Sequence, residues 1–193
     1  NPQAGANFGA AIASVGPVTV GNTNCAQGLL VGAPGQDVGA NANQGQAYLI
    51  CAPTGALLLT LNNPLPQAGA KFGSSVASAG DIDHDGKNDL FVGAPGQDGS
   101  VGKAFVFSSA NGNLLRTLNH PTPLVGSFFG SAVASAGDLN GDLVPDLIVG
   151  TPGQNTGVFV PGHAFVFSGS NGALLLTLDD PNPQGSETGI GMT

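Results

Sequence analysis

The sequence repeats itself three times, and this tandem repeat restricts the fold more than any other feature of the chain. The clearest copies are Phe72–Asp81 and Phe129–Asp138, and a weaker copy runs from Phe8 to Gly16. The phenylalanines that open the three copies lie about 60 residues apart, at positions 8, 72 and 129. A repeat of this length predicts a propeller or another array of like structural units.

Each repeat contains four stretches that are typical of short β-strands. The third stretch is apolar at nearly every position, which predicts a sheet covered on both faces by its neighbours. Asn111-Gly112 and Asn171-Gly172 separate the third and fourth stretches and favour a tight hairpin turn. Prolines follow the fourth stretch, where a central strand has to end. In the second repeat the four stretches are Phe72–Asp81, Phe91–Pro95, Ala104–Phe107 and Leu114–Leu118.

These patterns predict an all-β fold of propeller-type blades, each made of four antiparallel strands. An ordinary β-sandwich is the alternative, but it does not require three like units. We expect one repeat array over residues 1–193. Its expected parts are blade 1 at about 4–63, blade 2 at about 64–120, blade 3 at about 121–181, and residues 182–193 as the opening of a fourth repeat or an inter-subunit strand.

The charged residues of the chain argue against one class of function and in favour of another. Four Lys and Arg against twelve Asp and Glu give a net charge of −8, so no basic surface is present to bind nucleic acid. No apolar run approaches the roughly 20 residues of a membrane-spanning helix. The acidic residues crowd into two short windows, where they repel one another unless a cation lies among them. Those in the windows are Asp81, Asp83, Asp85, Asp89, Asp138, Asp142 and Asp146.

Both windows have the oxygen-rich spacing that calcium prefers, with ligands at positions 1, 3, 5, 7 and 9 of a nine-residue loop. Position 7 is expected to offer its backbone carbonyl. Metal-free Asp/Asn/Gly turns are the alternative. The second loop has one carboxylate fewer, because Asn140 stands at its position 3, so we expect it to bind calcium more weakly. The expected ligands are Asp81, Asp83, Asp85, Lys87 and Asp89 in the first loop, and Asp138, Asn140, Asp142, Val144 and Asp146 in the second.

The first repeat breaks this pattern. Pro17 stands where the second repeat has Asp81, and Gly28 stands where it has Asp89, so we expect no metal there. Cys25 lies in this altered loop, and Cys51 ends the third stretch. Because the ends of paired antiparallel strands are neighbours, the two cysteines form either a disulfide or two small buried thiols.

The order of Phe-Gly, an acidic loop and Gly-Ala-Pro resembles the FG-GAP repeat of integrin α-subunit propellers and of many bacterial surface proteins. The resemblance extends over the whole chain and is most specific in the second and third repeats. It implies four-stranded blades, calcium in the loop between the first two strands, and an adhesion or surface role. It also implies an extracellular or cell-surface setting, which is oxidising and favours the Cys25–Cys51 disulfide.

Catalysis finds no support in the sequence. None of His84, His120 and His163 has a Ser or Cys partner at a recognisable spacing, so we expect a non-enzymatic protein. Three blades are too few to close a ring. One interpretation, which the sequence favours slightly, is a structural protein whose blades associate head to tail into a larger assembly or filament. The other is a fragment of a closed integrin-like propeller that binds a protein or glycan ligand. An accessory domain beside a catalytic domain is a third alternative.

Overall fold

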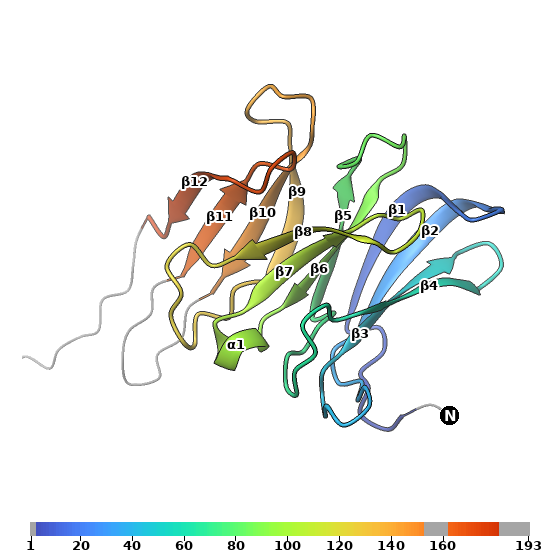
Figure 1. Cartoon of the computed structure of the whole chain (residues 1–193), viewed down its shortest axis with the longest axis horizontal. Coiled ribbons are helices and arrows are strands. Elements are labelled where there is room, and N and C mark those ends of the chain that lie inside the picture. Colours follow the sequence, from blue (N-terminus) through green and yellow to red (C-terminus); the bar gives the residue numbers. More distant parts are fainter. Residues whose placement is uncertain (1–2, 153–161, 182–193) are drawn as a thin grey trace, which may run out of the picture.

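Three four-stranded antiparallel sheets follow one another along the chain (Figure 1). The structure is a computed structural model, and it describes residues 3–152 and 162–181. Each sheet takes its strands in chain order, with the first strand at one edge and the fourth at the other. The all-β fold of four-stranded blades is therefore confirmed. The strands are β1 (Ala11–Val20), β2 (Thr23–Ala33), β3 (Gln46–Cys51) and β4 (Ala56–Asn62) in blade 1; β5 (Ser75–Gly80), β6 (Asp89–Ala94), β7 (Lys103–Phe107) and β8 (Leu114–Asn119) in blade 2; and β9 (Ala132–Gly137), β10 (Asp146–Thr151), β11 (His163–Phe167) and β12 (Leu174–Asp179) in blade 3.

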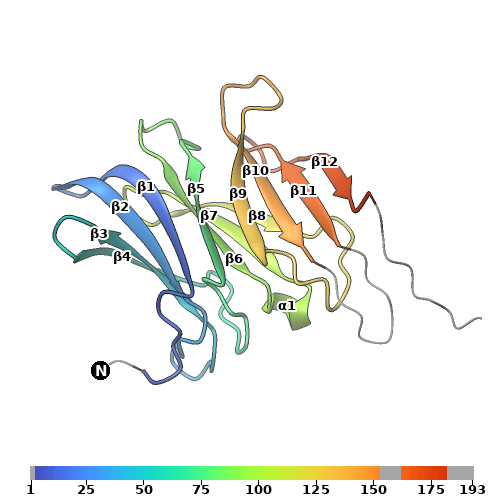
Figure 2. The same ribbon diagram turned by 180° about the vertical axis from the view of Figure 1, so that it is seen from behind.

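The blades stand side by side in a row with blade 2 in the middle, as both views of the ribbon show (Figures 1 and 2). Strand β6 is buried at every position, and β7 at every position after its first residue. This follows from the continuous apolar sequence of these strands, which suits a sheet packed on both faces. One short helix, α1 (Gln97–Ser100), connects β6 to β7. The exact blade limits stay a prediction, and residues 182–193 lie outside the described part of the chain.

The core lies between the blades. One buried cluster joins apolar side chains of blades 1 and 2, including Leu30, Leu61 and Phe72. A second cluster joins blades 2 and 3 and includes Leu118 and Phe129. Each interface thus buries the phenylalanine of the Phe-Gly pair that opens the following repeat. Burial of a whole phenylalanine side chain contributes about 1.5–3 kcal/mol, so this residue anchors each blade to the one before it.

Blade 1 differs from the other two in its first hairpin. Strands β1 and β2 are longer than their counterparts and continue pairing as far as Val20 and Thr23. A disulfide joins Cys25 of β2 to Cys51 at the end of β3, with the two Cα atoms 5.7 Å apart. The two strands pair beside this link, since Gly28 lies opposite Cys51. The cross-link therefore ties the long hairpin to the rest of its sheet.

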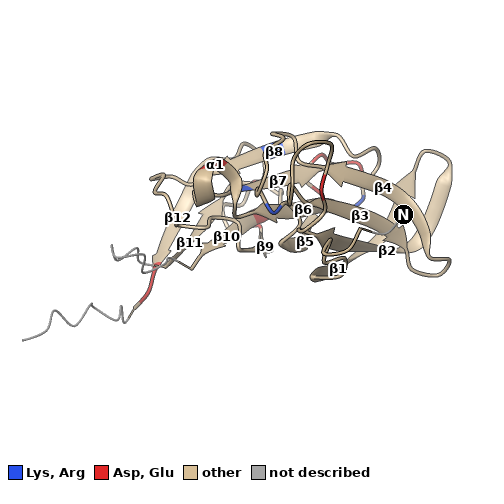
Figure 3. Ribbon diagram, turned by 90° about the horizontal axis from the view of Figure 1, so that it is seen from below, with Lys and Arg blue, Asp and Glu red and all other residues tan. Residues whose placement is uncertain are grey.

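Few positions along the strands are charged residues, as the coloured ribbon seen from below shows (Figure 3). Within the described residues, no helix is both long enough and apolar enough to span a bilayer.

Candidate metal centre

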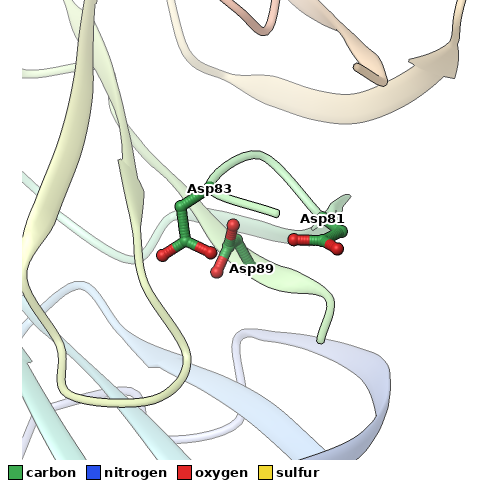
Figure 4. A group of neighbouring side chains, drawn as sticks. All are labelled: Asp81, Asp83 and Asp89. Atoms are coloured by element: carbon green, nitrogen blue, oxygen red, sulfur yellow. The ribbon is translucent and has the colours of Figure 1, made fainter. Parts of the chain in front are cut away.

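The loop that joins β5 and β6 gathers three acidic side chains. One carboxylate oxygen from each of Asp81, Asp83 and Asp89 lies within 4.8 Å of the other two (Figure 4). Over residues 3–152 and 162–181, no other three Asp, Glu, His or Cys side chains come together in this way. The three carboxylates stand at positions 1, 3 and 9 of the loop, three of the positions at which the sequence predicts calcium ligands.

The loop curls because its own carboxylates accept backbone N–H groups. Asp81 accepts hydrogen bonds from the amides of Asp85 (3.1 Å) and Gly86 (2.9 Å). The side chain of Asp85 in turn accepts the amide of Lys87 at 2.8 Å. Such side-chain-to-backbone bonds favour tight turns over a continued strand. Asp85 does not belong to the cluster of three, and its role as a ligand, like that of the Lys87 carbonyl, stays a prediction.

Asp89 is the one completely buried member of the three clustered carboxylates. Its carboxylate accepts the backbone amides of Ile82 at 2.9 Å and Ser109 at 3.1 Å. The pKa of Asp89 is raised to about 6: burial is the largest cause, the charges of Asp83 and Asp85 act in the same direction, and the two amide hydrogen bonds act against them. A cation placed among these groups has the opposite effect on the pKa, because it stabilises the ionised carboxylate.

The loop between β9 and β10 has the same framework. Asp138 accepts the amides of Gly141 (2.7 Å) and Leu143 (2.9 Å). Asp146 is completely buried, like Asp89, and accepts the amides of Leu139 (2.8 Å) and Gly169 (3.2 Å). The first and ninth positions of the two loops are therefore held in the same way.

The middle of this second loop is arranged differently. The side-chain amide nitrogen of Asn140 donates to Asp142 at 3.0 Å, while the side-chain oxygen of Asn140 accepts the amide of Asp142 at 2.9 Å. Ser170 also donates to the Asp142 carboxylate at 2.7 Å, and this hydrogen bond lowers the pKa of Asp142. A cation here would have to compete with both donors for the Asp142 oxygens. The structure thus gathers a carboxylate cluster in blade 2 but none among the described residues of blade 3.

Both loops pass through left-handed backbone at positions 4 and 6, although the glycine occupies a different position in each. In blade 2 the two residues are His84 (φ 61°) and Gly86 (φ 81°), and in blade 3 they are Gly141 (φ 80°) and Leu143 (φ 67°). Residues other than glycine rarely adopt this backbone conformation, which costs them about 1–2 kcal/mol each. The shared backbone shows that the two loops have one conformation despite different sequences.

Sequence reasoning missed the partners that come from the turn between the third and fourth strands. The backbone amides of Ser109 and Gly169 hold the buried carboxylates from this turn, and Ser170 binds Asp142 from the same place. The turn lies 20 or more residues beyond the acidic loop along the chain. Only the fact that Ser109 and Gly169 align between repeats could have indicated a common role.

The donor set in blade 2 fits calcium. Calcium binds six to eight oxygen ligands and favours carboxylates, and three carboxylates meet here at the end of a hairpin. In blade 1 the corresponding loop has no acidic residue, and the Cys25–Cys51 disulfide ties its hairpin instead.

The FG-GAP repeat family matches residues 72–107 and 129–173, which are the second and third repeats. This chain therefore contains FG-GAP repeats. Integrin alpha-2 of Mus musculus is 32% identical over 163 residues, and the match covers 79% of this chain but 13% of that protein. Integrin alpha-IIb of Homo sapiens is 36% identical over 169 residues, which is 79% of this chain and 15% of that protein. The FG-GAP array thus spans about a seventh of the length of these relatives, or less.

Proposed function

We propose that this FG-GAP array is part of an integrin-like propeller that acts at the cell surface as a non-enzymatic adhesion or ligand-binding module. The observation that carries the proposal is the match to integrin α subunits over 79% of the chain. The same observation favours the propeller over the filament, which had been the slightly preferred interpretation of the sequence. A protein or glycan is the expected class of ligand, and the expected setting is extracellular.

Calcium is the cofactor that we propose for this module, with one ion in blade 2 and one in blade 3. Asp81, Asp83 and Asp89 would hold the first ion, together with Asp85 and the Lys87 carbonyl. Bound calcium neutralises the crowded carboxylates and cross-links the ends of the loop. The ligands proposed for the second ion are Asp138, Asn140, Asp142, the Val144 carbonyl and Asp146.

Isothermal titration calorimetry with calcium tests the cofactor. The wild-type chain should bind two ions, and Asp83→Asn should lose the tighter one, because the substitution removes one of the three clustered carboxylates. Asp98→Asn is the matched control: Asp98 lies outside both loops and pairs with Lys103 at 2.9 Å. Absence of binding heat in the wild type, or equal loss in the two variants, would contradict the calcium assignment.

A separate experiment tests ligand binding. The immobilised chain would be exposed to a panel of purified extracellular-matrix proteins and glycans, in millimolar calcium and again with a chelator. The proposal expects saturable binding to at least one probe, with weaker binding in the chelator. If every probe fails although calorimetry shows calcium bound, the adhesion function is wrong while the metal assignment stands.

A further inference from the structure

Adjacent blades are joined by the same contact twice. The contact has a plug, which is the Phe-Gly pair that opens a repeat, and a socket on the blade before it. A socket consists of the glycine of Gly-Ala-Pro (threonine replaces the alanine in blade 3), the glycine that precedes the third strand, and the last leucine of the fourth strand. The sockets are Gly32, Gly45 and Leu61 in blade 1, Gly93, Gly102 and Leu118 in blade 2, and Gly150, Gly162 and Leu178 in blade 3.

The sockets of blades 1 and 2 are filled. A Cβ atom added at Gly32 or Gly45 would overlap the backbone of the plug Phe72–Gly73. A Cβ atom at Gly93 or Gly102 would likewise overlap the plug Phe129–Gly130. Backbone hydrogen bonds fix both plugs, with the amide of Phe72 donating to Gln44 and that of Phe129 donating to Val101, each at 2.9 Å. Glycine is therefore needed at these positions because another backbone lies against them.

The socket of blade 3 keeps its residues but has no plug among the described residues. Leu61 and Leu118 are 2% and 1% exposed, whereas Leu178 at the same position is 43% exposed. Of the residues that the structure describes, only Ala132 would lie within 4 Å of a Cβ atom added at Gly150, with its own Cβ at 3.2 Å. Instead a hollow of about 600 Å³ opens here, and Gly150, Gly162 and Leu178 are part of its lining.

Blade 1 carries a plug that fills no socket among the described residues. The backbone of Phe8–Gly9 matches the two docked plugs, since the φ angles of Gly9, Gly73 and Gly130 are 88°, 87° and 89°. The ring of Phe8 packs against Tyr48 of its own β3 at 5.7 Å, just as Phe72 packs against Phe105 of β7 at 5.9 Å. Nevertheless Phe8 is 61% exposed, whereas Phe72 and Phe129 are completely buried.

We propose that the socket of blade 3 binds the Phe8–Gly9 plug of a second copy of this chain, in the contact that already joins blade 1 to blade 2 and blade 2 to blade 3. The proposal extends an established interface with surfaces that the same chain presents at opposite ends of its row of blades. It depends neither on calcium nor on the ligand proposed above, and the second copy would supply further blades to the integrin-like propeller. The contact is heterologous, so each copy offers one plug and one socket.

Charge sets the conditions under which the contact forms. Each copy carries a net charge of −8, and two like-charged copies repel until salt screens them. The lining of the socket is mostly apolar, although Asp179, Asp180 and His163 also belong to it, with His163 Nδ1 2.9 Å from Asp179. Association should therefore strengthen as the salt concentration rises, which is the opposite of what an ionic interface would show.

Sedimentation velocity over a concentration series tests the proposal with three variants. Phe8→Ser removes the plug, and Gly150→Ala blocks the socket with a methyl group, for which Ala132 of the same blade has to move by a few tenths of an ångström. Gly93→Ala is the matched control, since its methyl group meets a plug that is already docked, and it should destabilise the folded chain itself. Circular dichroism and thermal unfolding check that the first two variants remain folded.

The expected result is concentration-dependent association of the wild type, weakened at least about tenfold in either Phe8→Ser or Gly150→Ala. A mixture of these two variants retains one intact plug and one intact socket, so it should form dimers and nothing larger. A wild type that stays monomeric at every concentration and salt overturns the proposal. So does association that is insensitive to Phe8→Ser, or a variant mixture that fails to dimerise.

Discussion

Removal of the Cys25–Cys51 disulfide should cost blade 1 about as much stability as calcium loss costs blade 2. The two cysteines are 26 residues apart in sequence. Closing a loop of that length in the unfolded chain corresponds to about 3.5 kcal/mol at 25 °C. For comparison, an ion that binds only the folded state contributes about 2.7 kcal/mol at a hundredfold excess over its dissociation constant.

The perturbation is the double substitution Cys25→Ala/Cys51→Ala, followed by urea unfolding in calcium and in chelator. Because the blade-1 loop has no acidic residue, the loss of about 3.5 kcal/mol should be the same in both conditions. The loss in Asp83→Asn should appear only in calcium. Wild-type protein treated with a reductant should reproduce the double variant, and the variant itself should not respond to the reductant.

Two results would refute this reasoning. A loss of less than about 1 kcal/mol would mean that the unfolded chain is already restricted in this region, since the entropic gain requires a free loop. A loss that depends on calcium would mean that the blade-1 hairpin and the acidic loops are not independent.

Two further predictions concern the acidic loops. Leu143→Gly should raise the free energy of unfolding by about 1 kcal/mol in a urea titration, because Leu143 is 83% exposed and adopts a left-handed backbone that favours glycine; unchanged or lower stability would contradict this. The second concerns pH: the pKa of Asp89 is about 6 in the folded chain against an ordinary value of 3.8, so the folded state holds a proton that the unfolded state releases. Without metal, stability should therefore fall as the pH rises from about 4 to about 6. Thermal unfolding across this range should show the fall in chelator, and both calcium and Asp89→Asn should reduce it.

The fold could be predicted from the sequence because the pattern of a four-stranded unit occurs in it three times. The hairpin turn at Asn111-Gly112, the apolar third strand and the prolines at each crossover all indicate the same four-stranded unit. Each of these patterns involves residues that are close together along the chain, so a single sequence is enough to detect it. The Phe-Gly pair was recognisable too, but its role as the contact between blades was not. That role depends on glycines such as Gly32 and Gly93, which lie on a different blade from the plug that they accommodate.

The acidic loops were predicted only in part, and the reason is the same. Alternation along the loop is consistent with the proximity of Asp81, Asp83 and Asp89. It does not indicate that the carboxylate of Asp85 accepts a hydrogen bond from the amide of Lys87. Nor does it indicate that Asp89 accepts one from the amide of Ser109, which lies in another turn. These contacts depend on how the sheet folds the chain back on itself.

The first hairpin carries a different chemistry in each of the three blades. Blade 1 uses a covalent link, blade 2 has a cluster of three carboxylates, and in blade 3 an asparagine and a serine already satisfy part of the acidic loop through hydrogen bonds. The repulsion that a cation would relieve is therefore greatest in blade 2. Since Ile82 of its loop and Val144 of the blade-3 loop belong to one buried cluster, ordering of either loop also supports the packing of the other. Stability against reduction and the proposed stabilisation by calcium thus belong to different blades, while the interfaces between the blades are built from equivalent residues.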